Sequence, residues 1–145
     1  MKKLAVIQSG YIPWKGYFDM LSYADLFIVH DDVQYTKGDW RNRNKIKTPR
    51  GNEWLTIPCG TDTNRLINEV EIVNQDWKIK HWRRLKANHE KSSCYKEVAS
   101  FFENFYLNEV TVNLSELNIK MIKLICDFLN IQTPITTSSQ YILKK

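Results

Sequence analysis

The densest group of reactive side chains lies in one stretch of the chain, residues 31–45, which holds three acids and four bases. Arginine forks bind anions, indole rings stack on planar groups, and adjacent carboxylates can hold hydroxyls or accept a proton. The stretch therefore predicts a site for an anionic ligand that contains a ring, with Asp31 and Asp32 as the candidate catalytic residues. A solvated charged loop is the alternative. The candidate binding residues are Gln34, Lys37, Trp40, Arg41, Asn42, Arg43 and Lys45.

A second group of candidate binding residues lies where the first apolar run turns toward a helix. It contains Gln8, Tyr11, Trp14 and Lys15. Backbone N–H groups and the dipole at a helix N-terminus attract phosphate or carboxylate, although simple packing is the alternative for Trp14 and Tyr17. If the strands that precede the two groups are neighbours, both groups line one cleft.

A strand–helix–strand unit would position these groups. Leu4–Ile7 and Leu26–Val29 are short apolar runs, and Pro13–Tyr23 between them has the apolar spacing of a helix. We expect two parallel strands that are buried on both faces and joined by a right-handed crossover. Because sites in open parallel sheets form beyond the carboxyl ends of strands, we expect the site at residues 8–14 and 30–35.

An antiparallel insert is predicted after this unit. Residues 45–48 and 53–57 alternate around a Pro-Arg-Gly-Asn turn, which indicates a β-hairpin. Ile67–Val73 alternates again and predicts a third antiparallel strand.

Three helices and a late strand complete the predicted fold. The helices are expected over residues 76–91, 95–107 and 115–129, with Asp76 and Ser115 as N-caps. The β-branched stretch Thr133–Thr137 predicts a strand that returns to the main sheet. We therefore predict one α/β domain with a three-layer, Rossmann-like parallel sheet, an inserted hairpin and three following helices.

The first of these helices carries a basic and aromatic pattern of the kind that binds nucleic acid. Residues 77–91 interleave Trp77 and Trp82 with lysines and arginines. A helix whose rings dock on the sheet while its bases stay in water has the same pattern. We favour this second interpretation and do not expect nucleic acid as a ligand. His81 and His89 lie two helical turns apart, which disfavours a shared metal ion.

The composition limits the classes of protein and of function that the chain can have. The chain has 145 residues, of which 43% are hydrophobic and 26% charged, so it suits one globular domain and excludes a disordered or fibrous chain. The net charge of +5 favours anionic ligands. Three cysteines without paired spacing predict small buried side chains, with Cys59 as an alternative nucleophile. We expect a cytoplasmic protein with no membrane span, no metal and no evident cofactor.

Several of these motifs together resemble the WbqC-like family of bacteria. They are QSGYIPWKGYF at residues 8–18, DDVQY at 31–35, WRNRNKIK at 40–47 and WLTIP at 54–58. The resemblance runs over nearly the whole chain. It implies that residues 1–145 correspond to about the N-terminal two-thirds of a typical member and lack the C-terminal part of the fold.

The resemblance implies a role in cell-surface polysaccharide biosynthesis, as for the O-antigen of lipopolysaccharide. It implies a transferase that adds an acyl or amino-acyl group to a nucleotide-linked amino sugar. Arg41, Arg43 and Lys45 would then neutralise phosphate, and Trp40 or Tyr11 would stack on a base or sugar.

Other interpretations stay open beside this one. A weaker resemblance to the nucleotidylyltransferase-like superfamily rests on Gly16, the one residue kept from an HxGH motif, and concerns only the fold. A non-catalytic protein could instead bind nucleic acid or a partner through the 77–91 helix. A truncated, inactive remnant could cover its exposed apolar surface by forming a homodimer.

Overall fold

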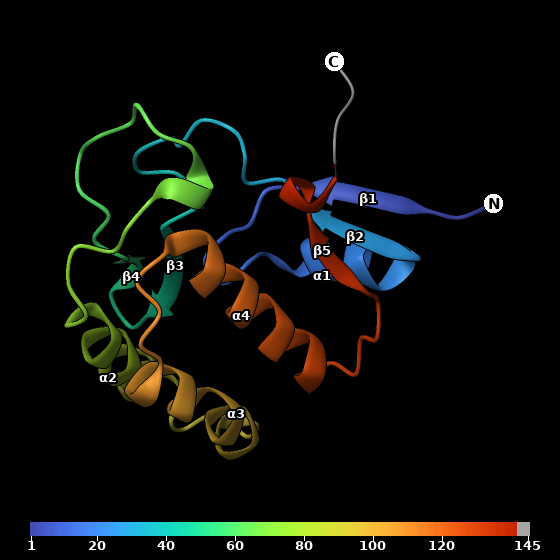
Figure 1. The fold of residues 1–145 in the computed structure, drawn as a ribbon. Helices are drawn as coiled ribbons and strands as arrows, with labels where there is room; N and C mark the ends of the chain where they lie inside the picture. The colour runs from blue at the N-terminus through green and yellow to red at the C-terminus, as the bar shows by residue number, and fades with distance from the viewer. Residues whose placement is uncertain (142–145) are drawn as a thin grey trace.

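The computed structural model describes residues 1–141 (Figure 1). Its elements in chain order are β1 (Leu4–Ile7), α1 (Lys15–Tyr23), β2 (Leu26–Val29), β3 (Arg43–Thr48), β4 (Gly51–Thr56), η1 (Ile67–Glu69), α2 (Trp77–His89), α3 (Tyr95–Asn108), α4 (Leu114–Phe128), β5 (Ile135–Thr137) and η2 (Ser138–Gln140). The α/β class is confirmed, and so are the three helices that follow the hairpin.

The main sheet has the strand order β1-β2-β5, and all of its strands are parallel. Leu4 pairs with Leu26, and Phe27 pairs with Ile135. The predicted parallel strands and the late returning strand are therefore confirmed. Figure 1 shows the carboxyl ends of the three strands at one edge, where η2 begins.

The two faces of this sheet have different surroundings. Ala5, Phe27 and Val29 point toward α1 and α4 and form one apolar cluster with them. On the opposite face Leu4 is 58% exposed and Val6 is 52% exposed, because alternate residues of a strand point to opposite faces. The predictions of strands buried on both faces and of a three-layer sheet are wrong for residues 1–141, where the helices cover one face.

The predicted hairpin is confirmed as the antiparallel pair β3 and β4. Ile46 and Leu55 on its inner face are buried in a second apolar cluster, which also holds residues of α2, α3 and α4. Trp77 and Trp82 belong to this cluster. The expectation that these rings are buried is confirmed, but the expectation that they dock on the parallel sheet is wrong.

The expected strand over residues 67–73 is absent from the described structure, which has the turn η1 there. Ile67, Val70 and Ile72 are the buried residues, so the buried positions do not alternate strictly, and Ile67 and Val70 have the spacing of three that a helical turn gives. Asn113 caps α4 in place of Ser115, because its side-chain oxygen accepts a hydrogen bond from the backbone N–H of Glu116. Asp76 is the N-cap residue of α2, as predicted, but its side chain makes no capping hydrogen bond.

No helix within residues 1–141 has the length and apolar character that a membrane span requires.

Candidate functional site

A cleft of about 490 Å³ lies beyond the carboxyl end of β1, at the edge where the sequence predicts a site. Its walls come from the β1–α1 turn and from the segment before β3, so the two predicted groups of residues do meet. The predicted residues that line the cleft are Gln8, Tyr11, Trp14, Trp40 and Arg41.

Two backbone segments cross closely at the floor of this cleft. The N–H of Tyr11 donates to the carbonyl of Trp40 over 3.0 Å. A Cβ atom on Gly10 would lie only 3.2 Å from the same carbonyl oxygen, so residue 10 must be small for the segments to approach. This crossing holds Trp40 and Arg41 against the β1–α1 turn.

The cationic group of the cleft is the guanidinium of Arg41. It donates to the side-chain oxygen of Gln8 and, over 3.4 Å, to the carbonyl of Ser9. Its ion pair with Asp39 is loose at 3.8 Å. The guanidinium is thereby held in one orientation, while a weak acidic partner leaves it able to bind an incoming anion.

Two exposed indole rings line the cleft. Trp14 is 69% exposed and Trp40 is 52% exposed. The ring of Trp14 lies over Gly16, where a Cβ atom would come within 1.9 Å of it. Large exposed rings beside a fixed cation are the arrangement that stacks a planar group of an anionic ligand.

The outer face of the hairpin extends this surface. The ring centroids of Trp40 and Trp54 are 5.4 Å apart. The guanidinium of Arg43 lies 4.1 Å from the Trp54 ring centroid, and the ammonium of Lys45 lies 4.7 Å from it. Trp54 is therefore part of an aromatic and cationic surface beside the cleft.

The remaining predicted binding residues lie outside the cleft lining. Asn42 is buried and donates from its side chain to the carbonyl of Ile57 over 2.9 Å, which ties the segment before β3 to the end of β4. Lys15 and Lys37 are exposed. The side chain of Gln34 faces a neighbouring loop. The structure does not bring these side chains together at one ligand-binding position.

Asp31 is buried between three elements rather than open to the cleft. Its carboxylate accepts from the backbone N–H of Ser9 over 2.8 Å and from the hydroxyl of Ser115 in the first turn of α4. The positive end of the α4 dipole also favours this charge. With both oxygens engaged, Asp31 joins β2, the β1–α1 turn and α4, and we assign it a structural role.

Asp32 instead belongs to a partly exposed cluster with His30 and Ser138. His30 Nδ1 lies 3.1 Å from Asp32 Oδ1 and 3.1 Å from Ser138 Oγ. The hydroxyl of Ser138 also donates to Asp32, and this hydrogen bond is the main cause that lowers the pKa of Asp32 below its ordinary value. We place the ring proton of His30 on Nδ1, facing the carboxylate, which leaves Nε2 as its basic nitrogen.

Ser138 is a candidate site residue that sequence reasoning missed, whereas His30 begins the predicted segment 30–35 without being named there as a candidate residue. Gln8, His30 and Ser138 directly follow β1, β2 and β5, so they form a row along the carboxyl edge of the sheet. Neighbouring strands lie about 4.8 Å apart. The signal in the sequence was the position of each residue immediately after an apolar strand.

Tyr11 turns inward from the cleft and is only 1% exposed. Its hydroxyl lies 2.7 Å from the hydroxyl of Tyr106 and 2.9 Å from His81 Nδ1. Burial raises the pKa of both tyrosines and lowers the pKa of His81 from 6.5 to about 4. Stacking on a ligand therefore falls to Trp14 and Trp40 rather than to Tyr11.

The neutral state of His81 predicts a pH-dependent stability. Because its pKa is lower in the folded chain than in the unfolded chain, acid favours the unfolded chain, which binds the extra proton. We expect the free energy of unfolding to fall by about 3 kcal/mol as the pH drops from 6.5 to 4. Urea unfolding across this range measures the loss. In His81→Gln the free energy of unfolding should depend less on pH, whereas His89→Gln should show the pH dependence of the wild type. The same pH dependence in the wild type and both variants would contradict the role assigned to His81.

The cysteines divide between core and surface. Cys59 and Cys126 are buried as expected, whereas the prediction for Cys94 is wrong because it is exposed. Burial raises the pKa of Cys59 to about 12, which opposes a role as a thiolate nucleophile. Residues 1–141 hold no cluster of three His, Cys, Asp or Glu side chains that could bind a metal ion.

The chain is similar to a known protein family and to a curated protein. The model of the WbqC-like protein family matches residues 8–145. The chain is 44% identical over 143 residues to a protein of Mycobacterium tuberculosis named uncharacterized protein Rv1507c. The match covers 97% of this chain and 62% of that relative, so the chain spans less than two thirds of the relative's length. No solved structure matches the chain.

Proposed function

The chain belongs to the WbqC-like protein family, and on that premise we propose a function in bacterial cell-surface polysaccharide biosynthesis, of the O-antigen type. We propose a transferase that modifies a nucleotide-linked amino sugar in the cytoplasm. The observation that carries this proposal is the meeting of Arg41 with the exposed rings of Trp14 and Trp40 in one cleft. A Rossmann-like relationship would also suit a nucleotide at the carboxyl edge of the sheet.

The proposed ligand suits the groups around the cleft. A diphosphate would bind the guanidinium of Arg41, and the cations of Arg43 and Lys45 lie beside Trp54 on the adjoining surface. A base or sugar would stack on Trp40 or Trp14. We propose no metal or other cofactor.

The proposed reaction is acyl or amino-acyl transfer to the sugar amine. The amine nitrogen attacks the carbonyl carbon of the donor, a new N–C bond forms, and the bond from that carbon to the leaving group breaks. A base must take the amine proton. His30 is our candidate because Asp32 orients its ring and leaves Nε2 basic. This moves the catalytic proposal from Asp31 to His30 and keeps Asp32 as its partner.

A nucleic-acid function is less well supported by the helix that suggested it. Trp77 and Trp82 of α2 are buried, so they cannot stack on bases. Lys80 and Arg83 remain exposed beside a groove that Trp54 also lines, which leaves an electrostatic mode of binding.

Calorimetric titration of the 145-residue chain with UDP-, dTDP- and GDP-linked amino sugars tests the proposal. We expect saturable binding of at least one of them. We expect Arg41→Lys to weaken that binding about 10-fold or more, because the planar fork is lost while the charge remains. Arg83→Ala is the matched control and should bind as the wild type does.

Three results would contradict the proposal. The first is no binding of any nucleotide sugar, and the second is unchanged affinity in Arg41→Lys. The third is tight binding of single-stranded nucleic acid that falls steeply with salt and depends on Arg83, which would support the nucleic-acid function instead.

A further inference from the structure

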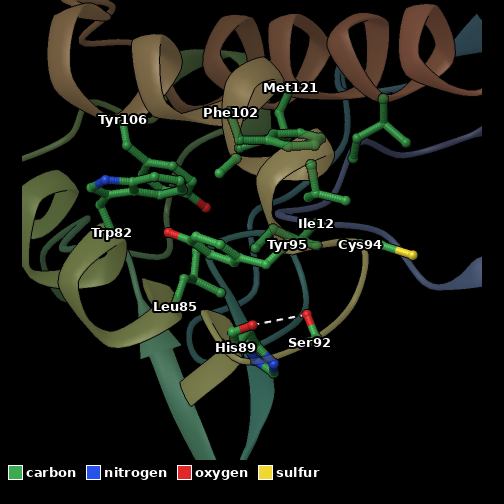
Figure 2. Close-up of a pocket in the computed structure, with 13 residues that line it drawn as sticks. Ile12, Trp82, Leu85, His89, Ser92, Cys94, Tyr95, Phe102, Tyr106 and Met121 are labelled. Carbon is green, nitrogen blue, oxygen red and sulfur yellow. Dashed lines mark hydrogen bonds between the residues drawn. The ribbon is translucent and has the colours of Figure 1, made fainter. Parts of the chain in front are cut away.

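A second cavity, of about 310 Å³, lies between α2, α3 and α4 (Figure 2). Its walls are aliphatic and aromatic, and they include Leu85, Phe102, Tyr106 and Met121. Figure 2 shows Phe102 and Met121 on one side of the hollow, with His89 and Ser92 on the opposite side. The cavity is therefore enclosed mainly by hydrocarbon.

Three of the polar side chains along its walls are already paired. The hydroxyl of Tyr106 lies 2.7 Å from that of Tyr11. The indole N–H of Trp82 donates to Glu103, and the hydroxyl of Ser92 donates to the carbonyl of His89. A polar ligand group placed against these atoms would lose water without gaining a hydrogen bond, which is unfavourable. The walls, which are mainly hydrocarbon, thus favour an apolar ligand.

Ile12 connects this cavity to the cleft, because it lines both of them. Its φ angle of 49° is unusual for a β-branched residue, and such conformations are found most often at ligand sites. The side chain of Asn44 holds the turn by donating to the carbonyls of Tyr11 and Ile12. One residue therefore separates the apolar cavity from the cleft that contains Arg41.

We propose that this cavity holds the aliphatic chain of the acyl group to be transferred, with its carbonyl end directed past Ile12 toward the cleft. The inference rests on the proposed acyl transfer and names the donor class as an unbranched acyl chain of medium length.

The volume supports this choice of ligand. It is about twice the ~150 Å³ of an apolar cavity that admits benzene, and it lies at the lower end of the range for ligand pockets. One turn of helix, about 10 Å wide and 5.4 Å long, would exceed it. A whole helical turn therefore does not fit inside the cavity, whereas a hydrocarbon chain does.

Titration of the 145-residue chain with butanoate, hexanoate, octanoate and decanoate tests the inference. We expect the affinity to rise up to about fourfold for each added methylene until the cavity is filled. Ala99 lines the cavity, so Ala99→Phe should weaken octanoate binding at least 10-fold. Ala87→Phe makes the same change at an exposed position of α2 outside the cavity and should leave binding unchanged.

Affinity that does not grow with chain length in the wild-type protein would overturn the inference, and this result needs no variant. Equal octanoate affinity in Ala99→Phe, or in the milder Ala99→Leu should the larger ring unfold the chain, would overturn it as well. Titrations with nucleotide sugars, carried out in parallel, distinguish the two proposals. Alkanoate binding without nucleotide-sugar binding supports the cavity assignment and contradicts the proposed function; the reverse result contradicts only the cavity assignment.

Discussion

Asp31→Ala is expected to lower the free energy of unfolding by about 2–5 kcal/mol, because it leaves two buried donors without an acceptor. These donors are the backbone N–H of Ser9 and the hydroxyl of Ser115. The loss of stability should be large, because the carboxylate of Asp31 and its two donors join β2, the β1–α1 turn and α4 at the edge of the sheet that positions the cleft. Urea unfolding at pH 7 measures it.

The adjacent aspartate is a matched control. Asp32 is partly exposed and lies in the cluster with His30 and Ser138, so Asp32→Ala should cost less than about 1 kcal/mol of stability. It should instead reduce the proposed transfer activity, because the ring of His30 loses the carboxylate that orients it. Equal stability losses in the two variants would contradict the division of roles between the two residues.

Trp82→Ala is expected to lower the free energy of unfolding by about 3–5 kcal/mol, the usual cost of removing a buried indole. The ring is stacked on Tyr106 with the centroids 5.7 Å apart. Its removal would open a void in the apolar cluster of α2, α3 and the hairpin, and would enlarge the cavity of Figure 2. Thermal and urea unfolding both report the change.

Trp40→Ala removes the same side chain from a half-exposed position and should change stability by no more than about 0.5 kcal/mol. We expect it to weaken nucleotide-sugar binding, since the stacking ring is lost. A Trp40 variant that unfolds as readily as the Trp82 variant would show that the Trp40–Trp54 pair is part of the core.

Much of the fold follows from local patterns. Leu4–Ile7 and Leu26–Val29 are apolar runs separated by a helical repeat, and such a unit has few alternatives to two parallel strands. What these runs could not reveal is which faces are covered. The outward side chains of Leu4 and Val6 are as apolar as the buried ones. Nothing in the local sequence therefore contradicts the expectation that helices cover both faces.

The meeting of several candidate residues in one cleft was predictable, but the environment of each residue was not. Gln8, Trp14, Trp40 and Arg41 meet because strand ends gather at one edge. Asp31 stands beside Asp32 in the sequence, yet its environment depends on Ser115, which is distant in the chain.

The same lack of local information applies to the stacking rings. In the sequence, Tyr11 is as suited to stacking as the nearby Trp14. In the structure, its hydroxyl lies in the core within hydrogen-bond distance of Tyr106 and His81. Burial and long-range partners, rather than residue type, decide these roles.

The parallel sheet has a consequence for the order in which the protein can fold during synthesis. The central strand β2 ends at residue 29, but its second neighbour β5 begins only at residue 135. One edge of β2 therefore stays unpaired until the ribosome has made nearly all of residues 1–141, and pairings so distant in sequence form slowly. During that interval an apolar strand edge is open to other chains, so expression at reduced temperature or with chaperones should raise the yield of folded protein.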